Sequence, residues 1–278
     1  MNRIFIIVVL LFIKLSCFSQ QSIDSAYLKV TYLEDFVRNA DNLSKKSYDE
    51  LVLNIGEYSS EFYSLREDRV MQIRDSVLAA GGNGFQAYDA CADLPRSRQK
   101  FRLYKNLYSD NKLIYIDEVD ANLYYKYNET IEKPVWTFLQ EKKEIQGYAC
   151  QKAKTKFKGR EWAAWFTTEI PVSEGPWKLC GLPGLILDAV DSDSLYHFYC
   201  VGVNKLSKKR PIKIFKTKYV ACDKKEFYSA MKQMYEQPLE FFKRFGATTG
   251  KVTDANGRPV KLPVRKYVDM EVLESAKK

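Results

Sequence analysis

The stretch from Ile170 to Val203 constrains the fold most, because glycine and proline set its turns and two apolar runs set what it buries. Its six-residue turn segment fixes the chain direction: proline holds φ near the value for the second position of a type II turn, and a following glycine supplies the positive φ of the third. We therefore expect a positive φ at Gly184, and inward packing of the flanking apolar residues. The turn segment consists of Gly181, Leu182, Pro183, Gly184, Leu185 and Ile186.

Two strands are expected after this turn. Leu185 to Val190 reads as a buried strand, residues 191–194 form a polar turn, and Leu195 to Val203 returns. Both faces of the returning strand are largely apolar, which predicts a strand covered on both sides. His197, the only histidine, is therefore expected in the core and not in a catalytic triad.

The rest of the chain alternates short apolar segments with polar turns, with Lys158-Gly159 as one tight hairpin turn. Helical periodicity occurs only in residues 66–80 and in residues 223–244, where Asp223 is the expected N-cap and Pro238 the expected break. We expect an α+β fold in a single domain, dominated by a long, curved antiparallel β-sheet with two helices. A half-barrel is one form that such a sheet can take.

Several motifs between Trp136 and Val203 resemble the GLPGLI family of exported proteins from the Bacteroidota. The turn segment matches the hexamer that gives the family its name. The resemblance is also carried by Gly-Tyr-Ala-Cys-Gln-Lys-Ala at 147–153, Phe-Lys-Gly-Arg at 157–160, Ala-Trp-Phe-Thr at 164–167, Glu-Ile-Pro at 169–171 and Gly-Pro-Trp-Lys at 175–178. The ending, Tyr267 to Leu273, departs from the family pattern. The resemblance implies export and supplies no reaction and no catalytic residues.

The N-terminus has the layout of a secretory signal peptide. Arg3 precedes an apolar run from Ile4 to Ile13, and small residues stand near Ser19. We expect a signal peptide at 1–19, a single domain at 20–278, and a location in the periplasm or at the outer membrane of a Gram-negative bacterium. A lipid anchor on Cys17 is the alternative.

The charge balance is basic. The formal net charge is +9, and removal of residues 1–19 with Arg3 and Lys14 leaves +7. Lysine and arginine are densest between Lys205 and Lys218. Such a charge suits a lipid or another anionic component of the envelope, and export argues against nucleic acid.

No cofactor or metal motif stands out. The mature chain keeps five cysteines, which permit two disulfides of undetermined pairing in an oxidising compartment: Cys91, Cys150, Cys180, Cys200 and Cys222. None forms a Cys-Xaa-Xaa-Cys pair. Asp188, Asp191 and Asp193 are more simply explained by a hairpin than by a calcium site.

Arg160, Trp165 and Trp177 are the candidate ligand-binding residues: two rings would form an aromatic wall, and Arg160 would hold an anion. In a regular strand Trp162 points away from Trp165, so these two cannot line one pocket. We expect a non-catalytic binding or accessory protein, either a carrier of an apolar ligand or a partner of an outer-membrane transport complex. The alternative is an envelope hydrolase whose catalytic carboxylates the sequence does not identify.

Overall fold

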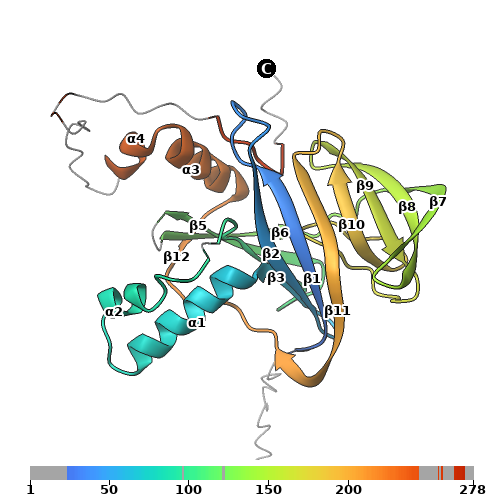
Figure 1. Ribbon diagram of the computed structural model, residues 1–278, viewed down its shortest axis with the longest axis horizontal. Coiled ribbons are helices and arrows are strands. Elements are labelled where there is room, and N and C mark those ends of the chain that lie inside the picture. The colour runs from blue at the N-terminus through green and yellow to red at the C-terminus, as the bar shows by residue number, and fades with distance from the viewer. Residues whose placement is uncertain are drawn as a thin grey trace, which may run out of the picture.

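Twelve strands form one sheet in the order β12-β6-β5-β4-β3-β2-β1-β11-β10-β9-β8-β7 (Figure 1). The computed structural model describes residues 24–95, 97–120, 123–243, 256, 258 and 266–272, so the expected signal peptide lies outside the described residues. The strands are β1 Ser25–Val37, β2 Lys46–Ile55, β3 Ser60–Ser64, β4 Arg102–Lys105, β5 Lys112–Asp120, β6 Leu123–Thr130, β7 Thr137–Ile145, β8 Tyr148–Phe157, β9 Arg160–Thr167, β10 Leu185–Asp191, β11 Tyr196–Pro211 and β12 Tyr219–Ala221.

The sheet consists of two meanders, β1 to β6 and β7 to β11, joined where β1 pairs with β11. Two tight turns, Gln146-Gly147 and Lys158-Gly159, connect strands of the second meander. All four residues have positive φ, as a type I′ hairpin turn requires. Every pairing is antiparallel except that of β12 with β6. The predicted antiparallel sheet is therefore confirmed, with one short parallel strand added.

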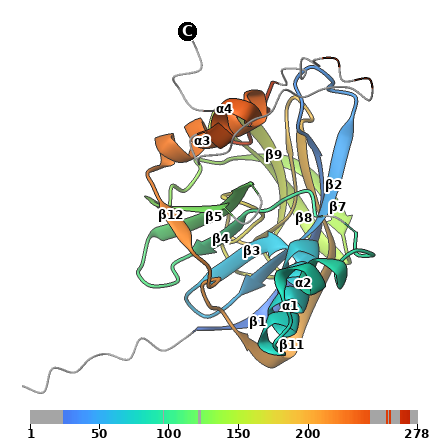
Figure 2. The same ribbon diagram turned by 90° about the vertical axis from the view of Figure 1, so that its left-hand side faces the viewer.

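The sheet bends around its main core, so β7 and β8 lie on the opposite side of the molecule from β5 in both views (Figures 1 and 2). A row of aromatic rings fills the bend. The ring centroids of Trp177 and Trp162 lie 5.9 Å apart, those of Trp162 and Phe198 6.3 Å apart, and those of Phe198 and Phe62 6.2 Å apart. The apolar residues behind the turn segment are also buried. Side chains therefore fill the space inside the bend, where a carrier would hold an apolar ligand.

Within the described residues four helices accompany the sheet, where the sequence predicted two: α1 Leu65–Ala79, α2 Gly84–Asp89, α3 Lys224–Glu236 and α4 Pro238–Lys243. Asp223 caps α3, and Pro238 separates α3 from α4, as predicted. Helix α2 was not predicted because its 6 residues are too few to show a helical period. A capping box between Asn83 and Gln86 begins it. None of the described helices is long and apolar enough to cross a membrane.

The helices cover both faces of the sheet. On the main-core face, the ring centroid of Phe227 in α3 lies 5.5 Å from that of Tyr115 and 5.3 Å from that of Tyr127. On the other face, Met71 of α1 joins a smaller core with Ile114 and Ile116. Adjacent residues of β5 thus enter two different cores.

The sequence also favours strands at residues 212–220 and 267–273, and neither forms over the predicted length. Strand β11 runs on to Pro211, through part of the basic run, because β1 pairs with it over this length. Of the segment expected at 212–220, only residues 219 and 220 lie in a strand, the short β12. Within the described residues, the strand expected at 267–273 is reduced to a single bridge between Tyr267 and Asn39.

The predicted positive φ at Gly184 is also wrong. Gly181 has it instead, with φ +92°. Glycine is required at 184 for a different reason: a Cβ atom there would lie 2.0 Å from the carbonyl oxygen of Thr167. The backbone of the turn segment therefore packs directly against the backbone at the end of β9.

His197 is not a core residue, which corrects a further prediction. Tyr196, Phe198 and Cys200 are buried in β11, whereas the His197 side chain is 33% exposed and its Nε2 lies 3.3 Å from Asp188 Oδ1. Only one face of this strand is fully covered, because no described helix packs over the outer face of β8 to β11.

Candidate functional site

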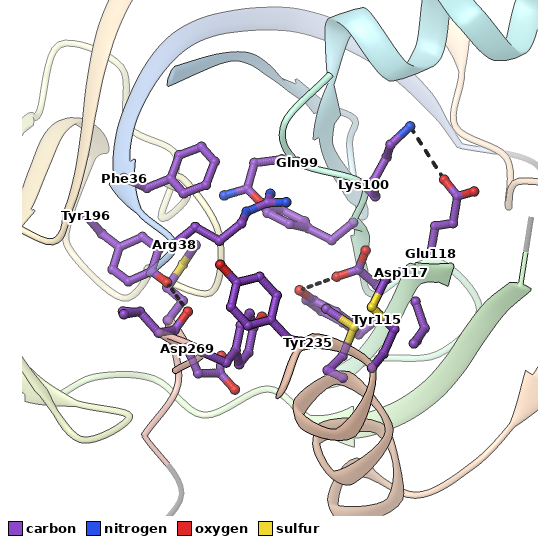
Figure 3. A pocket seen from close by; sticks show the side chains of 17 residues that line it. Phe36, Arg38, Gln99, Lys100, Tyr115, Asp117, Glu118, Tyr196, Tyr235 and Asp269 are labelled. Carbon is purple, nitrogen blue, oxygen red and sulfur yellow. Dashed lines mark hydrogen bonds and ion pairs between the residues drawn. The ribbon is translucent and has the colours of Figure 1, made fainter. Parts of the chain in front are cut away.

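A cavity of about 120 Å³ lies where the ends of β1 and β5 meet α3 and the C-terminal segment, residues 266–272 (Figure 3). Its wall is mostly aromatic and thioether groups, from these elements and also from β11 and the residue before β4: Phe36, Phe101, Tyr115, Tyr196, Met231, Met234, Tyr235, Tyr267 and Met270. We call it the acidic cavity because of the carboxyl groups described next. Its volume approaches that of a cavity that holds benzene, so it suits a group of a few heavy atoms.

Glu34 and Asp117 bring carboxyl groups to this end of the main core. Glu34 follows Tyr32 and precedes Phe36 on the inward face of β1, and Asp117 follows Tyr115 on that of β5. Asp117 lines the cavity, and Glu34 lies behind Gln99, whose Nε2 donates to Glu34 Oε2 at 2.8 Å. Burial raises the pKa of each carboxyl to about 8, because the charged form loses its hydration.

Asp269 is the third carboxyl, supplied by the C-terminal segment. Arg160 positions this segment: its Nε donates to the carbonyl oxygen of Met270 at 3.0 Å, and its Nη1 pairs with Asp191 at 2.8 Å. Burial raises the pKa of Asp269 to about 7. All three carboxyl groups thus titrate near neutral pH and not in the usual acidic range.

Few positive charges face these carboxyl groups. Arg38 lies in the middle of the view in Figure 3; it is exposed, and its guanidinium lies 5.3 Å from the ring centroid of Phe36. Lys100 pairs with Glu67 and, at 3.5 Å, with Glu118. Among the described residues no hydrogen-bond partner reaches Glu34 Oε1, a buried oxygen. The wall of the cavity itself therefore carries three carboxyl groups, Asp117, Glu118 and Asp269, and two cations, Arg38 and Lys100.

The described residues contain no group of three or more His, Cys, Asp or Glu side chains placed to hold a metal ion. All five described cysteines are free thiols, so the disulfides that the sequence permits are not formed.

A wider, polar hollow of about 770 Å³ lies near the opposite ends of β1 and β4. Its buried charges satisfy each other: Lys105 Nζ lies 2.7 Å from Glu174 Oε2, and Ser60 Oγ donates to Glu174 Oε1 at 3.1 Å. Because these groups are already paired, this hollow is the weaker candidate for a ligand site.

Residues 155–188 match the family described as "Protein of unknown function (Porph_ging)". This segment is similar to a family of unknown function. The match confirms, over this part of the chain, the family resemblance that the turn segment and its neighbours indicated. The Porph_ging match covers β9, the start of β10 and the connection between them.

No curated protein matches the chain. Among solved structures, PNGF-II in a C2 and in a P21 crystal is similar, with TM-scores of 0.46 and 0.45 and 15% identity in both. The alignments cover 74% and 73% of this chain, which spans about a third (32%) of the PNGF-II chain. At this level the likeness indicates no function.

The Porph_ging segment contains Arg160, Trp165 and Trp177, and the structure does not bring them together. Trp177 is 1% exposed and packs against Trp162 in the main core. Trp165 points from the opposite face of β9, where Lys143 Nζ lies 4.5 Å from its ring centroid. Arg160 is buried and bonded to protein groups. The aromatic wall with Arg160 as an anion anchor is therefore not formed.

The carboxyl groups of the acidic cavity went unnoticed in the sequence, although a signal was present. In β1 the inward positions read Leu28, Val30, Tyr32, Glu34 and Phe36, so one carboxylate interrupts an apolar series. Asp117 does the same in β5. An acidic residue in phase with the apolar face of a strand indicates a buried, functional or paired carboxyl group.

Proposed function

We propose that this chain is an exported, non-catalytic binding protein, and that its acidic cavity takes a small organic cation. The observation that carries this proposal is the excess of buried carboxyl groups in an aromatic-lined cavity. An ammonium or guanidinium group would supply the missing charge and a donor near Glu34 Oε1, and it would contact ring faces that attract cations.

The cavity favours this reading over a carrier of an apolar ligand. The main core is filled by its own aromatic side chains, and the enclosed space is small and edged with carboxyl groups. A lipid chain would need a continuous apolar groove. A cationic head of a few atoms fits both the volume and the charge.

Titration calorimetry with propylammonium and propylguanidinium at pH 8.5 tests the proposal. We expect Asp117→Asn to weaken binding at least about tenfold, since one charge-assisted contact is worth about 1.5–3 kcal/mol. Asp110→Asn, at an exposed aspartate near the other end of the sheet, should bind like the wild type. Absence of binding by both cations, or equal loss in both variants, would contradict the proposal.

A hydrolase that uses these carboxyl groups is the second candidate. The observation in its favour is the raised pKa of Asp117, which keeps a proton available at neutral pH for a leaving group. Mass spectrometry of envelope extract incubated with the protein distinguishes the two: a product that forms with wild type and not with Asp117→Asn supports the enzyme.

Export is part of the proposal and has its own test. Mass spectrometry of protein from the native envelope should find a mature N-terminus at or next to Gln20, as the Arg3 and Ile4 to Ile13 pattern predicts. Native conditions would also retain a ligand in the cavity. A lipid on Cys17 would replace the soluble periplasmic form with an anchored one.

A further inference from the structure

Three lysines stand at alternate positions on the outer face of strand β8: Lys152, Lys154 and Lys156. The residues between them point into the core, since Ala153 is fully buried and Thr155 nearly so. Alternate residues of a strand lie about 6.6–6.8 Å apart, so the three side chains start from points spread over roughly 13 Å. We call this row the lysine ladder.

A groove of about 520 Å³ runs beside the ladder. The base of the groove is formed by short side chains. Lys154 of β8 is opposite Ala163 of β9, and Ala163 is opposite Val190 of β10. The β10–β11 hairpin adds hydroxyl groups from Ser192 and Ser194. The groove therefore combines a row of ammonium groups with hydrogen-bonding side chains.

The ladder is only partly neutralised. Lys152 pairs with Glu141 at 3.2 Å and lies 5.5 Å from the ring centroid of Trp165. Neither Lys154 nor Lys156 has an ion pair within 4.0 Å of a carboxylate in the described part of the chain. Asp191, at the groove edge, is already paired with Arg160 on the core side. Lys156 stands in register with Glu161, an exposed carboxylate that also lines the groove, so Lys154 and Lys156 together keep an excess of positive charge that can attract an anion.

We propose that the lysine ladder and its groove bind a linear acidic polysaccharide, with carboxylate or sulfate groups repeating along the chain. Ammonium groups that stand in a line along the groove match charges that repeat along a linear polyanion. None of the groove residues is a large, exposed apolar side chain of the kind that enters a membrane. This site is separate from the acidic cavity and does not depend on it.

Fluorescence anisotropy with labelled heparin, a sulfated uronate polymer, tests the proposal on the full chain. The test variant is Lys154→Glu with Lys156→Glu. The matched control is Lys208→Glu with Lys209→Glu, which changes the net charge equally at two exposed lysines of β11. We expect the ladder variant to lose at least about tenfold in affinity, and the control less than about threefold.

The same variants give the outcomes that would overturn the proposal. Equal losses in both would mean attraction by net charge alone, and an unchanged ladder variant would exclude the groove. Binding to phosphatidylglycerol vesicles but not to heparin, lost in the ladder variant, would assign the ladder to a membrane surface. Lys154→Gln with Lys156→Gln, checked by its melting temperature, should show an intermediate loss and separates charge removal from misfolding.

Discussion

Single residues show the chemistry of this protein where they break a local pattern. Glu34 and Asp117 stand where strand alternation calls for apolar side chains, and burial raises the pKa of each carboxyl even though the charge of Arg38 opposes it. The folded state therefore binds their protons more tightly than the unfolded chain does. This difference makes stability depend on pH in a direction opposite to that of a salt-bridged carboxylate.

Asp117→Asn should flatten that dependence. The pKa of Asp117 rises from 3.8 to about 8 on folding, so wild-type stability falls as pH increases through this interval and is constant above it. The variant should gain roughly 2–5 kcal/mol relative to wild type between pH 4 and pH 8.5. Urea unfolding at a series of pH values measures this. An identical pH slope in wild type, Asp117→Asn and the exposed control Asp110→Asn would show that the carboxyl is not buried.

Gly184→Ala should destabilise the fold by about 1–3 kcal/mol, because the added Cβ overlaps the carbonyl oxygen of Thr167 and forces a backbone shift. Gly84→Ala is the matched control: no atom lies within 4 Å of its Cβ position, and alanine favours the helix that begins there. Thermal melts compare them. Equal melting temperatures for the two variants would mean that the close approach at Gly184 is relieved at no cost.

Elements with a clear period were predictable. Strand β8, Tyr148–Phe157, can be recognised in the sequence because its inward residues alternate with lysines and a Lys-Gly turn follows. The extension of β11 was not predictable, since its lysines resemble a solvated loop until β1 supplies hydrogen-bond partners. The position of the C-terminal segment depends on distant side chains, among them Arg160, Lys178 and Tyr196, which no local pattern indicates.

Arg160→Met tests that dependence. Removing the guanidinium leaves Asp191 buried without its cation and removes donors to the carbonyl oxygens of the C-terminal segment. Breaking such a pair costs about 3–5 kcal/mol. Lys243→Ala, which breaks an exposed pair with Glu240, should cost less than about 0.5 kcal/mol. Urea midpoints that shift equally in the two variants would contradict the anchoring role.

At the scale of the whole molecule, the bent sheet brings distant positions to one end. Asp117 in β5 and Asp269 beyond the last described helix line the cavity, and Glu34 in β1 lies behind Gln99 at the same end. Strand propensities predict the separate strands, but only the order of the sheet and the packing of α3 assemble the cavity. For this reason most strands were predictable from the sequence and the candidate site was not.

Proton release on cation binding tests the central claim most directly. At pH 7 Glu34 and Asp117 hold their protons, so a bound cation should ionise at least one of them and favour the charged form. Calorimetry of propylammonium binding at pH 7, in two buffers of different ionisation enthalpy, counts the protons. We expect about one or more protons released per cation bound, and tighter binding as pH rises. Binding with no proton release and no pH dependence would contradict a site built on these carboxyl groups.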